Sequence, residues 1–210
     1  MGEPAFKIRD VIARHNVRVL SSNYTLYGDM SARVDSALES FSQRIENYSI
    51  DESFLDLADV PAGDVGQLAR SMRATVKRWT GIPTCVGIGP MKTLAKLANA
   101  FAKDRPELAG VCDLRTQDAQ AKVLATFPVG KVWGVAPAYV ERLAQHGVTT
   151  AAELRDMPLD LARQVLTVVG MRTVAELRGV SCLPLELAAP APKNTAVTRS
   201  FGARVRPGKT

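Results

Sequence analysis

The first half of the chain alternates between two hydrophobic patterns. Apolar residues recur every three or four positions, as in amphipathic helices, in two segments, 29–44 and 65–79. Three short apolar runs of the kind that forms strands cover 45–50, 53–60 and 84–89. Pro90 follows the third run, at a position where the start of a helix tolerates proline. Helices interleaved with strands predict a layered α/β or α+β domain.

Beyond residue 112 the strand pattern disappears. Short amphipathic stretches separated by glycines predict a cluster of small helices over 116–126, 137–146, 150–156, 159–168 and 173–177. A proline-rich connector follows at 187–196. Residues 197–205 then alternate like a strand, and because a single strand is not stable alone, we expect a further domain to begin there.

The net charge of +6 is concentrated at one end of the chain. Five basic residues and no acid follow Glu186, so residues 1–186 are nearly neutral. A basic tail is compatible with a polyanionic partner such as nucleic acid. A solvated, unstructured end explains the same charge equally well.

Composition narrows the class of protein. Apolar residues make up 46% of the chain, as in ordinary globular domains, and no apolar run approaches the ~18 residues of a membrane helix. The three cysteines, Cys85, Cys112 and Cys182, are far apart and lack the spacing of a zinc site. We therefore expect a cytoplasmic protein without a disulfide scaffold and without a membrane partner.

An acidic pair interrupts the two apolar runs near position 50. Asp51 and Glu52 lie between strand-like segments with no glycine, asparagine or proline to form the turn. Adjacent carboxylates at a strand tip can bind a hard cation such as Mg²⁺, which prefers oxygen ligands. From the dipeptide alone, a solvated turn remains the commoner explanation.

Three lysines share one face of the helix predicted after Pro90. Lys92, Lys96 and Lys103 are spaced by four and seven residues, so the stripe would face solvent or phosphates. An ordinary amphipathic helix has the same pattern. A P-loop is excluded, because Val86 and Met91 stand where that motif requires glycine.

Residues 127–147 contain a glycine turn between two short helical patterns. This arrangement resembles a helix-hairpin-helix, which directs the amides of its turn at a DNA phosphate without reading the bases. Ala136 stands where the second glycine of the hairpin is usual. A purely structural turn explains the pattern equally well.

Taken together and in order, these segments resemble the Y-family, lesion-bypass DNA polymerases. Three segments match motifs of that family: Ser49–Glu52 (S-I-D-E), Val86–Ala98 (V-G-I-x-x-x-K-x-L-A-K-x-A) and Val132–Gly147 (the thumb hairpin). Three further segments are similar to the UmuC type within the family: 21–31, 176–183 and 198–202. The resemblance implies an α+β fold, with a mixed-sheet palm followed by a small helical thumb containing a helix-hairpin-helix.

The resemblance also implies roles for individual residues. Asp51 and Glu52 would be catalytic and would bind Mg²⁺ in a two-metal site. Lys103 would contact the incoming triphosphate, and Lys92 and Lys96 would lie close to the DNA. The implied substrates are dNTPs and a damaged primer-template, and the implied partners are UmuD-like subunits and the sliding clamp.

The same resemblance divides the chain into domains. The implied domains are the end of the fingers (1–23), the palm (24–114), the thumb (115–186), and a linker with the start of the little finger (187–210). Gly134, Val135 and Ala136 would hold the duplex backbone, and Arg199 would open the little finger.

The start of the chain departs from the family pattern. Residues 1–20 do not match the family's first strand with its metal-binding aspartate, its steric-gate aromatic residue or its tyrosine–arginine pair. Most of the little finger is also missing. We therefore expect a truncated error-prone polymerase that is inactive alone, and the alternative is a non-catalytic DNA-binding or partner-binding remnant.

Overall fold

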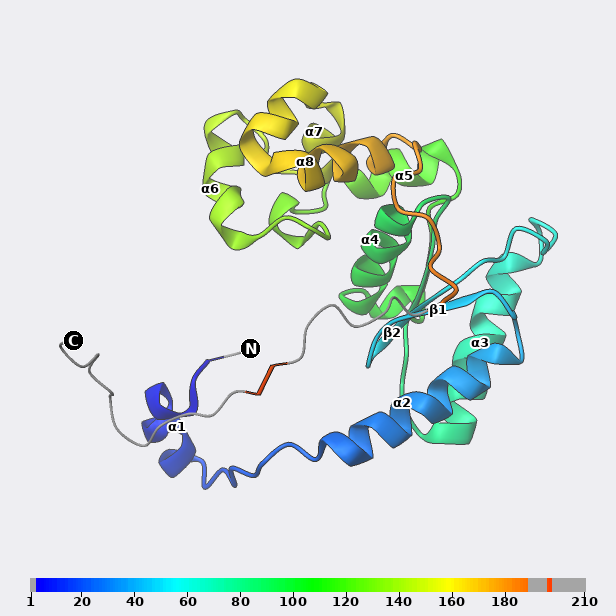
Figure 1. Cartoon of the computed structure of the whole chain (residues 1–210), viewed down its shortest axis with the longest axis vertical. Coiled ribbons are helices and arrows are strands. Elements are labelled where there is room, and N and C mark those ends of the chain that lie inside the picture. Colours follow the sequence, from blue (N-terminus) through cyan, green and yellow to red (C-terminus); the bar gives the residue numbers. More distant parts are fainter. Residues whose placement is uncertain (1–2, 189–195, 198–210) are drawn as a thin grey trace.

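The structure is a computed structural model that describes residues 3–188, 196 and 197 (Figure 1). The helices are α1 (Arg9–Arg14), α2 (Tyr24–Glu39), α3 (Val65–Thr80), α4 (Lys92–Lys103), α5 (Gln117–Leu124), α6 (Pro137–Gln145), α7 (Ala151–Asp156) and α8 (Leu159–Leu177). The strands are β1 (Ile45–Ser49), β2 (Glu52–Leu55), β3 (Val86–Ile88) and β4 (Val111–Asp113). Short 3-10 turns cover Ala5–Lys7, Pro106–Leu108 and Val129–Lys131.

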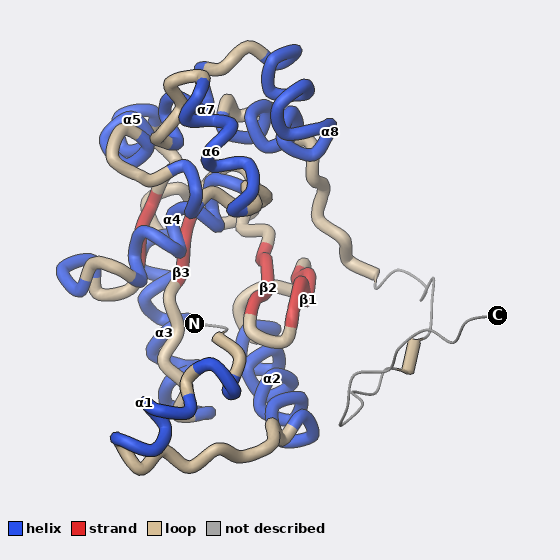
Figure 2. Tube along the Cα trace, turned by 90° about the vertical axis from the view of Figure 1, so that its left-hand side faces the viewer, coloured by secondary structure: helices blue, strands red, loops and turns tan. Residues whose placement is uncertain are grey.

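The four strands form two separate pairs (Figure 2). β1 and β2 form an antiparallel hairpin, with a register irregularity between Asn47 and Ser49. β3 and β4 are parallel and are connected through α4, as parallel neighbours require. Among the described residues, β2 pairs only with β1 and β3 only with β4.

The β3–β4 pair lies between two helices. Because side chains alternate along a strand, Val86 and Ile88 pack with Val65 and Ala69 of α3. The opposite face, at Gly87, meets the backbone of α4 directly. A layer of strands between two helices is the layered α+β arrangement that the sequence pattern predicted.

The second half of the chain is helical and shares a core with α4. Buried leucines from five helices meet in one cluster: Leu97 (α4), Leu124 (α5), Leu143 (α6), Leu154 (α7) and Leu177 (α8). Figure 1 shows these helices gathered above α4. The helical region is therefore continuous with the α/β layer through α4.

Most predicted elements are present, with shifted ends. The expected helix 29–44 begins earlier, because the Asn23 side chain accepts a hydrogen bond from the Leu26 amide and caps the start of α2. The helices predicted at 159–168 and 173–177 correspond to the two parts of α8, which are separated by a break in the helical geometry at Thr167 (φ 72°, ψ −174°), so the second part begins earlier than predicted. The strand predicted at 197–205 lies almost entirely outside the described residues.

Among the described residues, none of the helices combines the length and the apolar character needed to cross a membrane.

A capping box begins α7. Thr150 accepts a hydrogen bond from the Glu153 amide, and the Glu153 carboxylate accepts from the Thr150 amide. The amide and hydroxyl of Thr149 also donate to this carboxylate. The backbone amides, that of Thr149 first, lower the pKa of Glu153 from 4.5 to about 2.

We expect the contribution of Glu153 to stability to depend on pH. A carboxyl whose pKa is lower in the folded state stabilises the fold above its unfolded pKa, and this stabilisation is lost as the pH falls from about 4.5 to about 2. Glu153→Gln should lower the melting temperature by roughly 2 °C at pH 7, as expected for a weakened helix cap. Thermal melts should show the difference from wild type shrinking toward pH 2, and a constant difference would contradict the prediction.

Candidate functional site at the acidic hairpin

The acidic pair lies at the tip of the β1–β2 hairpin. Ser49 pairs with Glu52 in the ladder, so Ile50 and Asp51 form a two-residue turn. The Asp51 side chain is exposed, and one of its oxygens accepts a hydrogen bond of 2.9 Å from the Ser49 hydroxyl. Asp51 thus lies in a turn, as in the alternative interpretation of the sequence. Its second carboxylate oxygen has no hydrogen-bond partner among the described residues.

Glu52 differs from its neighbour because its carboxylate is already paired. Lys96 of α4 donates to Glu52 Oε2, and both side chains are partly buried. The Lys96 ammonium also lies 5.2 Å from the centre of the Tyr48 ring and 5.6 Å from that of Trp133. Lys96 therefore connects the hairpin to the residues that precede α6.

Three aromatic rings form a cluster beside the hairpin. The rings of Tyr48 and Phe54, one on each strand, are 5.6 Å apart in an edge-to-face arrangement. The Trp133 ring lies 5.5 Å from Tyr48 and 6.1 Å from Phe54. Edge-to-face pairs at these distances are attractive, so the cluster joins the hairpin to the helical region.

The lysine stripe predicted on α4 is divided between two environments. The side chains of Lys92 and Lys96 are only 11% and 16% exposed, and each pairs with a carboxylate, Lys92 with Glu46 and Lys96 with Glu52. Lys103, the last residue of α4, is exposed. Their proposed contacts with triphosphate and DNA remain predictions.

An open groove of about 1250 Å³ lies between β2 and β3. Residues 50–58 line it on the side of the hairpin and residues 82–92 on the side of β3. Asp51, Glu52, Lys96 and Lys103 are all at its wall. Lys92 also lines the groove, which therefore brings together the acidic pair and all three lysines that the sequence singled out.

The glycine turn at 134 has part of the expected geometry. Gly134 adopts a φ of 87°, Val135 is buried, and Ala136 occupies the N-cap position of α6 without a side-chain hydrogen bond, directly before Pro137, the first residue of the helix. The element before this turn, Val129–Lys131, is a 3-10 turn and not an α-helix. The helix-hairpin-helix is thus not confirmed, and DNA binding by residues 134–136 stays a prediction. Arg199 lies outside the described residues.

The donor set at the hairpin fits a divalent cation in part. Asp51 offers an exposed carboxylate, whereas Glu52 would first have to exchange Lys96 for the metal. No group of three or more His, Cys, Asp or Glu side chains suited to a metal occurs within the described part of the chain. A two-metal site needs several anionic oxygens, so these two carboxylates require at least one more ligand.

Comparison with known proteins shows which proteins this chain is similar to. Residues 1–100 match the model of the impB/mucB/samB family. Protein MucB of Escherichia coli is 43% identical over 206 residues, which are 98% of this chain and 49% of that protein. Protein UmuC of Salmonella typhimurium is 45% identical over 97% of this chain and 49% of that protein.

The first 100 residues of the chain are thus similar to the impB/mucB/samB family. The predicted UmuC-type resemblance is confirmed, and the chain spans about half the length of the curated relatives it matches. DNA polymerase IV of Alkalilimnicola ehrlichii is 33% identical over 67% of this chain and 39% of that protein.

Solved structures identify the fold. A DinB family error-prone DNA polymerase from Sulfolobus solfataricus has a TM-score of 0.74 at 20% identity, covering 89% of this chain and 55% of that chain. An insertion ternary complex of Dbh DNA polymerase has a TM-score of 0.72 at 21% identity, covering 88% and 53%. The predicted α+β Y-family fold is therefore confirmed, while the boundaries of fingers, palm, thumb and little finger stay predictions.

The sequence did not predict the contacts of three further residues, two buried carboxylates and a tryptophan. Glu46 and Glu176 are almost fully buried, and Trp133 joins the aromatic cluster. Nothing in the local pattern signals that Glu46 is buried, since it precedes an exposed part of β1. Glu176 lies between Ala175 and Leu177 on a helix, and an acid in that apolar setting was a signal.

Proposed function

We propose that this chain is part of an error-prone, lesion-bypass DNA polymerase that performs template-directed nucleotidyl transfer. The observation that carries the proposal is the acidic hairpin at the wall of the groove, in a chain related to MucB and UmuC and folded like Y-family polymerases. Fold alone does not determine function, so the acidic pair and the lysines beside it are essential to the argument.

Asp51 and Glu52 are the proposed ligands of Mg²⁺. Such ions, when bound, activate the attacking oxygen and stabilise the leaving pyrophosphate. Asp51 is available to bind because it is exposed and, among the described residues, accepts a hydrogen bond only from the Ser49 hydroxyl. The Lys96 ion pair holds Glu52 at the groove and offsets its charge in the absence of metal.

The groove supports the proposal in a second way. Its two sides, β2 and β3, each have one edge without a partner strand among the described residues. An extended segment is the natural partner of two open edges, because its amides and carbonyls satisfy both. We propose that a strand with an acidic residue, as the family resemblance implies, occupies this groove in the active protein and supplies the further ligand beside Asp51.

Substrate contacts complete the proposal. Lys103 is exposed at the groove and is the proposed ligand of the triphosphate. The amides around Gly134 and the basic Arg199 are the proposed contacts with the DNA backbone. UmuD-like subunits and the sliding clamp remain predicted partners.

Primer extension with Mg²⁺ and four dNTPs tests this function. The 210-residue chain, with two carboxylates at the hairpin, should bind primer-template without measurable incorporation. A form extended upstream to include a further acidic strand should incorporate nucleotides. If the extended form folds and binds primer-template but incorporates nothing, the polymerase proposal fails and the non-catalytic DNA-binding function is favoured.

A further inference from the structure

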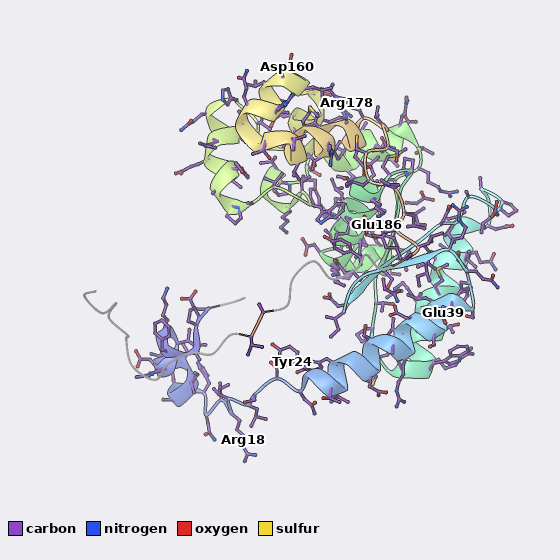
Figure 3. All side chains as sticks on the ribbon, viewed as in Figure 1. Arg18, Tyr24, Glu39, Asp160, Arg178 and Glu186 are labelled. Atoms are coloured by element: carbon purple, nitrogen blue, oxygen red, sulfur yellow. The ribbon has the colours of Figure 1, made fainter. Side chains whose placement is uncertain are left out.

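The chain crosses the molecule after α8. Residues 181–186, here named the strap, run from the end of α8 past α4 to the β1–β2 hairpin (Figure 1). Figure 3 places Glu186, at the end of the strap, beside the strands and away from Arg178 at the end of α8. Leu183 and Leu185 are half-buried and line the groove. The strap is thus a wall of the groove that contains the acidic pair.

A buried carboxylate holds the first part of the strap. Glu176 is 0% exposed, and its Oε1 accepts hydrogen bonds from the amides of Cys182 (2.9 Å) and Leu183 (3.1 Å). Its Oε2 accepts from the amide of Thr93 (3.0 Å), in the first turn of α4. Glu176 therefore caps α4 and fixes the strap with the same side chain.

A second buried carboxylate holds the other end. Glu46 Oε2 accepts from the Glu186 amide (2.7 Å) and from the Lys92 ammonium. Lys92 also donates to the carbonyl of Pro184 (2.8 Å). Lys92 therefore contacts both β1 and the strap. The next residue, Thr93, donates its amide to Glu176, so the two buried carboxylates are held by neighbouring residues of α4.

These contacts depend on one another. A buried carboxylate is costly unless charged or hydrogen-bonding partners surround it. Glu176 takes two of its three amide donors from the strap, and Glu46 takes one of its two donors there. Detaching the strap would leave both carboxylates under-satisfied, so the strap and the carboxylates stabilise each other.

We propose that Glu46, Lys92 and Glu176 form a clasp that fixes the strap across the molecule, and that Lys92 is a positioning residue with no contact to DNA phosphate. The clasp links α4 to β1, the first strand of the acidic hairpin, and it fixes the position from which the chain continues beyond residue 186. This inference concerns the chain as it stands and does not depend on the proposed polymerase activity.

Amide hydrogen exchange of the 210-residue chain tests the clasp. Hydrogen bonds to charged groups are strong enough that losing one should raise local exchange at least about tenfold. Lys92→Met and Glu46→Ala should raise the exchange rate of the Glu186 amide. Glu176→Ala should raise the exchange rates of the Cys182 and Leu183 amides. Lys92→Arg should restore protection. Lys131→Met, which removes an exposed lysine paired with Asp104, is the matched control and should leave the strap unchanged.

Two outcomes would overturn the clasp. One is unchanged exchange at the strap in all three variants. The other is a rise that is equal at the strap and at core amides such as Leu143 and Leu154, because that would show general destabilisation. Core amides that keep their protection while the strap loses it would support the proposal.

DNA binding provides a second readout. A lysine that contacts a phosphate contributes about 0.9 to the slope of log K against log salt. Lys92→Met should leave this slope as in wild type, since Lys92 is occupied by Glu46 and Pro184. A slope less negative by about one would show that Lys92 contacts phosphate and would contradict the proposal.

Discussion

Replacing Asp51 with Ala is expected to lower nucleotide incorporation by at least about a hundredfold in a form of the protein that extends a primer. Losing even an outer partner of a metal ligand commonly costs 10–100-fold, and Asp51 is proposed to bind the metal directly. Folding should be unaffected, because the side chain is exposed and its contact is with Ser49. Single-turnover incorporation with Mg²⁺, together with thermal melts, measures both effects.

Glu52→Ala should have a smaller effect on incorporation than Asp51→Ala. Lys96 already occupies the Glu52 carboxylate, so Glu52 should contribute less to metal binding than Asp51 does, whereas its removal also leaves the mostly buried Lys96 without its carboxylate partner. We therefore expect a loss of activity and a measurable loss of stability together.

Asp59→Ala is the matched control for both variants. Asp59 is an exposed acid a few residues beyond β2 and has no ion-pair partner among the described residues. Its replacement should change neither incorporation nor stability. Near-normal incorporation by the Asp51→Ala variant would contradict the proposed metal site. It would favour the alternative interpretation, in which the acidic pair is only a solvated turn.

The hydrophobic periodicity predicted most helices and three of the four strands, and the pattern is clearest in α3 and α4, which each bury one face. β4 was missed because it has only three residues and ends in Asp113. Its identity as a strand depends on pairing with β3, a partner more than twenty residues away that no local pattern reveals. The start of α2 could have been read from Asn23, a residue type favoured at helix N-caps.

The sequence predicted which residues form the candidate site but not which residues they contact. The sequence singled out Asp51, Glu52 and the lysines of α4, and the structure brings them to one groove. The lysine stripe was expected to face solvent or phosphates, whereas Lys92 and Lys96 pair with Glu46 and Glu52. Their partners lie more than forty residues away in the sequence, so the spacing along α4 could not show them.

Gly87→Ala is expected to destabilise the fold by about 3 kcal/mol or more, a large fraction of the stability of a domain. A Cβ at position 87 would lie 2.1 Å from the Ala95 carbonyl oxygen and 2.2 Å from the Asn99 nitrogen. Both are backbone atoms of α4, so the helix would have to move away from β3 as a whole. Chemical denaturation should show a much lower midpoint than wild type.

Gly28→Ala, the same substitution at another position, is expected to have the opposite effect on stability. Gly28 lies within α2, and a Cβ there would meet no atom within 4 Å. Alanine in a helix is more stable than glycine by roughly 0.5–1 kcal/mol, so this variant should be as stable as wild type or more so. Equal midpoints for the two alanine variants would mean that α4 does not pack on β3 as closely as the contact at Gly87 requires. A midpoint that falls only at position 87 would establish that contact as the point where the helix of the lysine stripe is held against the sheet.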